Sequence, residues 1–139
     1  MKVKCIANTI AGLSQKTIEL GYSSETKFKI QVGETYTVYG MSMWKNSLDY
    51  LISEKETNNP AWYPAELFEV IYNLLPIIWY FNFERYKNYK GEDSEKAFWG
   101  YKEMIADPEH YANLVEGKQE AIDIFNKRKR QIDEYEDMR

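Results

Sequence analysis

The 139-residue sequence predicts an α+β fold, in which a small antiparallel β-barrel is followed by a helical C-terminal half. Two observations lead to this prediction. Residues 1–73 hold short β-branched and aromatic segments between turn residues, whereas the last third of the chain repeats apolar side chains at helical spacing. A chain of this length suits one compact unit. We therefore expect residues 1–73 to form the barrel, and residues 74–139 to pack on it as an aromatic connector and helices.

Alternation of apolar and polar side chains marks the predicted strands. The clearest case is KFKIQV, where Phe28, Ile30 and Val32 share one face and polar residues take the other. The following segment, TYTVYGM, is rich in β-branched and aromatic residues, which favour strands. We expect strands at residues 2–8, 27–32, 35–41, 44–53 and 67–71, joined by a polar loop at 9–26 and by turns at 33–34, 45–47 and 54–60.

The order of these elements is that of an SH3-like barrel. A strand and a long loop come first, then two strands joined by a tight turn, a hairpin, and a short last strand after a proline-marked corner. Several short strands joined by tight turns are typical of a closed or nearly closed antiparallel barrel.

The corner is the stretch NPAWYPAELFEVI, and it raises a question about function. Pro64 lacks an amide proton and has a fixed φ, so it suits a corner or an edge. It also restricts Tyr63 to extended geometry, so that one of Trp62 and Tyr63 faces the core and the other faces out. We favour a structural corner with a trans Pro64. The alternative is an aromatic anchor for a partner, with one exposed ring beside Glu66.

Capping and stop signals outline the helices of the second half. Asp93 or Ser94 can cap a first helix, and Asp107-Pro108 is a strong start signal for a short helix that ends at Gly117. The last helix is expected over residues 118–139. The apolar positions are Ala97, Phe98, Tyr101, Met104 and Ile105 in the first helix, and Ala121, Ile122, Phe125 and Ile132 in the last.

Between the halves lies an aromatic connector, LLPIIWYFNFERYKNY, at residues 74–89. We expect it to pack the barrel onto the helices, because so apolar a segment would favour aggregation if it were exposed.

No catalytic signature is present in the sequence. His110 is the only histidine and Cys5 the only cysteine, so a zinc site of the Cys/His kind is excluded. A Cys5–His110 nucleophile pair is disfavoured, because Cys5 lies inside a predicted strand and reads as a buried apolar residue. There is no glycine-rich phosphate loop. An enzyme would need Glu66, Glu69 and His110 to converge in one cleft. We expect no enzyme activity, no metal and no cofactor.

The net charge and the composition limit the classes of partner that this protein can have. The net charge is −4, which disfavours binding to nucleic acid, and no run of about 18 apolar residues predicts a membrane span. We therefore expect a cytoplasmic protein. The aromatic content of 16% suits protein interfaces as well as cores. Besides Trp62, Tyr63 and Glu66, the candidate partner-binding residues are four acids that crowd the end of the last helix, either as a charged surface or as an acidic docking tail: Asp133, Glu134, Glu136 and Asp137.

The run from Phe28 to Ile71, FKIQVGETYTVYG…LDYLISEKETNNPAWYPAELFEVI, resembles small bacterial proteins with an SH3-like N-terminal barrel. This group includes immunity proteins of contact-dependent growth-inhibition and related polymorphic toxin systems. The resemblance implies a protein that binds and blocks the toxin domain of a cognate effector, often a basic nuclease, without catalytic residues of its own. The alternative interpretation is an SH3-like module that recognises a peptide or another regulatory partner, although the ALYDY pattern of peptide-binding SH3 domains is absent.

Overall fold

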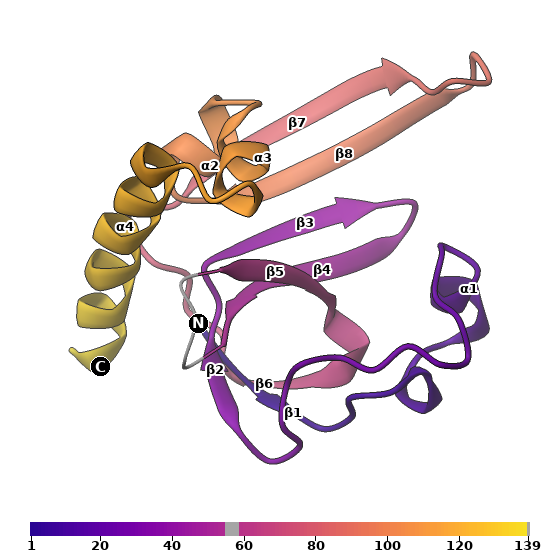
Figure 1. Cartoon of the computed structure of the whole chain (residues 1–139), viewed down its shortest axis with the longest axis horizontal. Coiled ribbons are helices and arrows are strands. Elements are labelled where there is room, and N and C mark those ends of the chain that lie inside the picture. The colour runs from indigo at the N-terminus through magenta and orange to yellow at the C-terminus, as the bar shows by residue number, and fades with distance from the viewer. Residues whose placement is uncertain (55–58, 139) are drawn as a thin grey trace.

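Two antiparallel sheets and a long C-terminal helix make up the computed structural model, which describes residues 1–54 and 59–138 (Figure 1). The smaller sheet has the strand order β2-β1-β6, and the larger has the order β5-β4-β3-β8-β7. The predicted α+β class is therefore confirmed. Neither sheet closes on itself, so the predicted barrel is not confirmed. The larger sheet joins strands from both sides of the boundary expected at residue 73.

The smaller sheet is built around the first predicted strand. Val3 and Cys5 alternate along it and both are fully buried, as the period-2 pattern predicted. The last predicted strand of the first half pairs with it, and Phe68 lies opposite Cys5. The strands of this sheet are β1 (Lys2–Cys5), β2 (Thr35–Thr37) and β6 (Phe68–Tyr72).

The larger sheet contains a hairpin with the two-residue turn Lys45-Asn46. Both residues have positive φ, 49° and 62°, which is the type I′ geometry that matches the twist of a hairpin. Trp44 consequently pairs with Ser47, and the turn predicted at residues 45–47 is confirmed. The strands are β3 (Gly40–Trp44), β4 (Ser47–Ser53), β5 (Pro60–Pro64), β7 (Tyr80–Lys87) and β8 (Asp93–Gly100).

The single strand predicted at residues 35–41 is wrong, because this segment passes from one sheet to the other. β2 ends at Thr37 and β3 begins at Gly40. A Cβ atom on Gly40 would lie 3.2 Å from the carbonyl oxygen of Trp99 in the neighbouring β8. Glycine therefore allows β8 to approach the point where the chain changes sheets.

The strand predicted at residues 27–32 is also wrong. Only an isolated bridge between Thr9 and Lys27 forms there. Phe28 is partly buried and Ile30 is buried, but Val32 is 59% exposed. β1 has already ended at Cys5, so this segment meets irregular backbone instead of a strand that could continue the ladder. The turn predicted at residues 54–60 lies mainly outside the described residues.

The largest correction concerns residues 74–105. The connector and the first predicted helix contain the β7–β8 hairpin, which extends from the body as an arm (Figure 1). β8 lies between β3 and β7, so both of its edges are paired. Residues 97–99 are all partly buried, so apolar side chains occur on both faces of this strand, and the Trp99 ring packs against Phe81. The same residues resemble a helical stripe when the pairing partners are unknown.

The helices follow the remaining predictions. A short turn of helix within the first loop is capped by Ser14, whose hydroxyl accepts a hydrogen bond from the Thr17 amide. Gly117 has a φ of 77° and separates the last two helices, as its predicted stop role requires. The buried face of the last helix includes Phe125 and Ile132. The helices are α1 (Gln15–Ile18), α2 (Lys102–Ala106), α3 (His110–Val115) and α4 (Gln119–Asp137), with 3-10 turns at Ile10–Gly12 and Ala65–Leu67.

Two cores lie on either side of the larger sheet. The first combines side chains of both sheets, among them Val3, Tyr50 and Phe68. The second joins the sheet to α3 and α4 through Leu51, Phe125 and other buried residues. Neighbouring residues of β4, Tyr50 and Leu51, thus belong to different cores, as the alternation of side chains along a strand requires.

Candidate functional site

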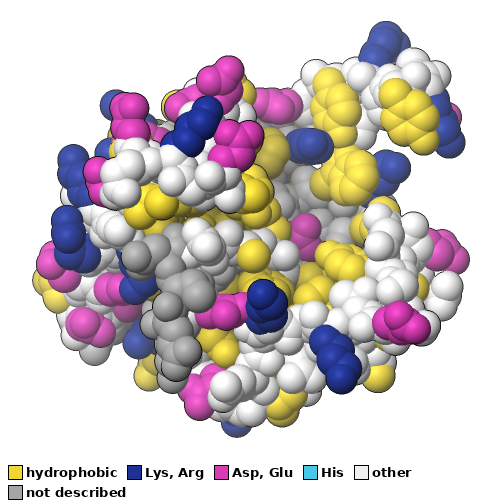
Figure 2. Space-filling model, viewed as in Figure 1, with side chains coloured by type: hydrophobic (Ala, Val, Ile, Leu, Met, Phe, Trp, Pro, Cys, Tyr) yellow, Lys and Arg dark blue, Asp and Glu magenta, His cyan; other side chains and the backbone are white. Residues whose placement is uncertain are grey.

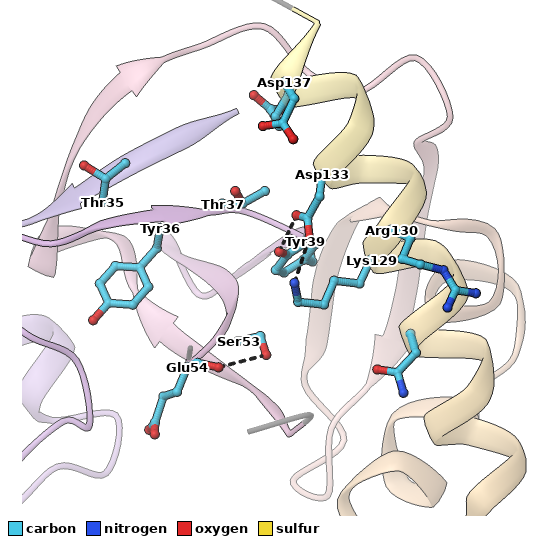
Figure 3. A pocket seen from close by; sticks show the side chains of 12 residues that line it. Thr35, Tyr36, Thr37, Tyr39, Ser53, Glu54, Lys129, Arg130, Asp133 and Asp137 are labelled. Carbon is cyan, nitrogen blue, oxygen red and sulfur yellow. Dashed lines mark hydrogen bonds and ion pairs between the residues drawn. The ribbon is translucent and has the colours of Figure 1, made fainter. Parts of the chain in front are cut away.

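Three of the four acids predicted at the end of the last helix, Asp133, Glu136 and Asp137, border a cleft between α4 and β2 (Figure 3). The cleft has a volume of about 600 Å³. α4 presents Lys129, Asp133 and Asp137 to it, because these positions are four residues apart and share one helix face. The full lining is Thr35, Tyr36, Thr37, Tyr39, Ser53, Glu54, Asn126, Lys129, Arg130, Asp133, Glu136 and Asp137.

Asp133 is held by partners within the cleft. The Tyr39 hydroxyl donates a hydrogen bond to its Oδ1 at 2.6 Å, and Lys129 Nζ donates to Oδ2 at 2.7 Å. Lys129 Nζ also lies 5.4 Å from the centroid of the Tyr39 ring. The pKa of Tyr39 is raised mainly by burial and, to a smaller extent, by the hydrogen bond and the negative charge of Asp133. The hydroxyl therefore stays protonated and acts as a donor. The positive charge of Lys129 balances the negative charge of Asp133, and the hydrogen bond from Tyr39 holds α4 against the sheet.

Glu136 is also held inside the fold. It is only 4% exposed, and it forms an ion pair with the N-terminal ammonium group of Met1. A buried carboxylate with a charged partner suits a structural contact that holds the end of α4 on β1. Of the four predicted acids, Glu134 and Asp137 are the ones with exposed side chains.

A group of exposed apolar residues, which was not predicted, lies in the last strand of the small sheet and in the segment that follows it. Ile77 is 84% exposed and Leu74 is 59% exposed, although the connector was expected to be covered. Only part of the connector, including Ile78 and Trp79, packs against a core. We call the exposed group the apolar patch: Val70, Ile71, Tyr72, Leu74, Leu75 and Ile77.

The register of the small sheet relates the apolar patch to the end of α4. Lys2 of β1 lies opposite Tyr72 of β6 on one side and opposite Thr37 of β2 on the other. Thr37 lines the cleft, and Met1, next to Lys2, holds Glu136. The patch is therefore one strand away from residues that contact the end of α4. Only β1 therefore separates the apolar patch from the cleft that the exposed Asp137 lines.

The aromatic corner contributes no exposed ring. Tyr63 is 7% exposed and packs against Phe28 and Phe68 in the first core. Trp62 is partly buried in the second core, where its ring contacts Tyr111. The expectation that one of the two rings would be substantially exposed is therefore not met.

Pro64 lies where the chain turns. It is the last residue of the edge strand β5, a 3-10 turn follows it, and its peptide bond is trans, as predicted. Glu66 is exposed and accepts hydrogen bonds from Ser14 and Thr17 near α1. Burial acts to raise the pKa of Glu66, but these hydrogen bonds outweigh it and hold the pKa below its usual range.

His110 and Cys5 have separate structural contacts. His110 is buried, and its Nε2 lies 2.7 Å from the Tyr101 hydroxyl. Burial lowers the pKa of His110, which keeps the imidazole neutral. The buried Cys5 thiol donates to the carbonyl oxygen of Ala7 at 3.2 Å, and burial raises its pKa. Among the described residues, no group of histidine, cysteine and acidic side chains could hold a metal ion.

Comparison with known proteins gave no match to any protein-family model, to any curated protein or to any solved structure. Within residues 1–54 and 59–138, none of the helices has the length and apolar character needed to cross a membrane.

Proposed function

We propose that this chain is a non-enzymatic binding protein that neutralises a cognate protein toxin, with a basic nuclease-type domain, by tight association in the cytoplasm. The observation that carries the proposal is the apolar patch, which β1 separates from the cleft that Asp137 lines. Two contacts support it. Lys2 of β1 pairs with Tyr72 on one side and with Thr37 on the other. Glu136 of α4 forms an ion pair with the N-terminal ammonium group of Met1, next to β1.

The physical form of this surface suits capture of a basic protein. Protein interfaces combine an apolar centre with a polar rim, and exposed apolar groups of this extent commonly mark interaction sites. Here the centre is the apolar patch and the rim is Glu134 and Asp137. Rim acids speed the approach of a basic partner, whereas the apolar centre sets how slowly the complex dissociates. Neutralisation of a toxin would need a Kd of about 1 nM or tighter, which is roughly −12 kcal/mol.

The proposal keeps the SH3-like description of residues 1–73. Supporting it, the first core draws Val3 and Phe68 from the small sheet and Tyr50, Ile52 and Tyr63 from the large one. Strands of both sheets surround one core, as in a barrel that is not fully closed. The partner surface that we propose lies outside the aromatic corner, which removes the main reason to favour a peptide-binding SH3 module.

The test is co-expression with the toxin domain encoded by the adjacent gene, combined with measurement of Kd for the purified pair. Ile77→Asp places a charge in the most exposed part of the patch. If Ile77 is a binding hot spot, this change should weaken Kd by about 30-fold or more, which corresponds to about 2 kcal/mol, and should reduce protection of growth.

Tyr89→Asp provides the matched control, because Tyr89 is 93% exposed but lies at the end of the β7–β8 arm. It should leave both Kd and protection unchanged. Failure of the wild-type chain to bind the toxin, or equal effects of the two substitutions, would contradict the proposal.

A further inference from the structure

The outer edge of β7 is open. β7 is the last strand of the larger sheet, and no described strand pairs with its other side. The Asn88 amide donates to the carbonyl oxygen of Glu92, so this even-numbered position forms a hydrogen-bonded pair across the hairpin. Hydrogen-bonded and non-hydrogen-bonded pairs alternate in antiparallel ladders. The backbone groups of the odd-numbered residues Phe81, Phe83 and Arg85 therefore point away from β8, toward the open edge.

Aromatic side chains line this edge. Phe81 is 57% exposed and Phe83 is 46% exposed, and both point to the same face of the strand. Figure 2 shows hydrophobic side chains on the protruding arm. Long, exposed and apolar edge strands favour pairing with another strand. Charged residues protect only the far half of β7, where Glu84, Arg85 and Lys87 occur.

The arm is held in an extended shape before any pairing. The Trp44 indole nitrogen donates to the Tyr86 hydroxyl at 2.8 Å, across β8. Ion pairs join Arg85 to Glu95 and Lys87 to Asp93 across the hairpin. The two ion pairs are exposed and individually weak, but together with the partly buried Trp44–Tyr86 hydrogen bond they order the strand in the geometry that a partner strand requires.

We propose that β7 pairs antiparallel with β7 of a second copy of this chain, about a two-fold axis at Phe83. In this register Phe83 lies opposite Phe83 of the second copy, and Phe81 lies opposite Arg85. The pairs are hydrogen-bonded, because all three residues turn their backbone groups to the open edge. The Phe83 amide donates to Asn82 Oδ1 at 2.9 Å in the single chain, and the paired strand replaces this acceptor by a backbone carbonyl. Aromatic pairs and an arginine over an aromatic ring are favourable cross-strand contacts.

Side chains on the opposite face fit the same register. Asn82 lies opposite Glu84 of the second copy, so the pairing sets no like charges directly across from each other. Tyr80 lies opposite Tyr86, next to a hollow of about 390 Å³ between β7 and α2. This self-complementary pattern favours a second copy over an unrelated partner, because a two-fold interface must match its own sequence. The result is one sheet that continues through both chains.

Sedimentation of the full chain from about 1 to about 100 µM tests the proposal, since this range covers weak strand-edge association. The wild-type protein should form dimers as concentration rises. Phe83→Lys places two like charges on the axis and should give a monomer at every concentration. Tyr89→Lys changes an even more exposed aromatic residue outside the paired segment, so this variant should dimerise like the wild type.

Cysteine variants test the register. Phe83→Cys should form a disulfide-linked dimer on mild oxidation, because opposed residues in a hydrogen-bonded pair have Cα atoms about 5.5 Å apart. Phe81→Cys should not, since the two copies of this position lie about 14 Å apart along the strands. The native Cys5 is buried and does not interfere. A monomeric wild type, dimers that survive Phe83→Lys, or equal cross-linking of the two cysteine variants would overturn the proposal.

Discussion

Replacing Tyr101 with phenylalanine removes one hydrogen bond from the second core and leaves the packing of the ring in place. Tyr101 is 1% exposed and His110 is 2% exposed. The Tyr101 hydroxyl and His110 Nε2 are 2.7 Å apart. The Tyr101 ring also packs against the His110 and Phe125 rings, with centroid distances of 5.4 Å and 6.3 Å. The substitution keeps these ring contacts and leaves a buried imidazole nitrogen without its partner.

The expected loss of stability follows from the burial of the His110 imidazole. Leaving a buried polar group unsatisfied costs about 1–3 kcal/mol. Unfolding entropy is about 2.1 cal/mol/K per residue, so a chain of 139 residues has an unfolding entropy of about 0.29 kcal/mol/K. Each kcal/mol therefore lowers Tm by about 3.4 °C, and Tyr101→Phe should lower Tm by about 3–10 °C.

Thermal unfolding followed by circular dichroism near neutral pH measures this change, at a pH where His110 is neutral. Tyr50→Phe is the matched control: Tyr50 is 5% exposed, and no hydrogen bond of its hydroxyl is present among the described residues. Its Tm should change little. Equal Tm values for the two variants would refute the reasoning, because the Tyr101 hydroxyl would then contribute no more than an unpaired one.

A double variant separates the hydrogen bond from general packing effects. Tyr101→Phe combined with His110→Leu replaces both polar partners by apolar groups, which can be far less costly than removing one. The double variant should be more stable than the sum of the single effects predicts, by about 1 kcal/mol or more. Strict additivity would show that the two side chains are not coupled.

Two further predictions concern charged groups. Burial raises the pKa of Asp49 to about 6, above its unfolded value of about 3.9, so the charged form destabilises the fold above about pH 6, and this penalty shrinks as the pH falls from about 6 to about 3.9 and is absent below that. In urea unfolding, Asp49→Asn should stabilise this partly buried position by about 1–2 kcal/mol at about pH 8 and should give no gain at about pH 3, below the unfolded pKa; equal gains at both pH values would contradict this. Arg128 binds Glu103 through Nε at 2.7 Å and through a terminal nitrogen at 2.8 Å, so Arg128→Lys, which cannot bind in this two-pronged way, should cost about 1 kcal/mol. The same change at the exposed Arg130 should have no measurable effect on unfolding, and equal losses at both sites would count against the pair.

Sequence alone predicted those elements whose signals are local. The turn at Lys45-Asn46, the stop at Gly117 and the last helix each depend on residues within a few positions of one another. The burial of Phe125 and Ile132 follows from their spacing on one helix. The structural role of Pro64 also followed from its own backbone restrictions. In these cases the neighbouring residues already determine the geometry.

The β7–β8 arm was not predicted, because its strands are defined by pairing with residues far away in the sequence. Ala97, Phe98 and Trp99 show no clean alternation, since both faces of β8 are partly buried there. The pairing of β8 with β3 and β7 joins residues far apart in the sequence. The signal that could have found the arm is the alternation of Phe81 and Phe83 with Asn82 and Glu84. That alternation was hidden by the assumption that apolar connector residues are covered. The candidate surface depends on similar long-range information, because the register of β1 determines which segments become its neighbours.

The apolar patch and the open edge of β7 are successive parts of one run of sequence, yet they are separate surfaces. Ile78 and Trp79 lie between them and pack against the core that contains Phe125 and Ile132 of α4. This anchor ends the patch at Ile77 and begins the edge at Tyr80, so a substitution on one side need not disturb the other. Ile77→Asp should therefore weaken toxin binding without affecting self-association, and Phe83→Lys should do the reverse. If each substitution impaired both properties while the fold remained intact, the two surfaces would be one interface, and the separation that the anchor implies would be wrong.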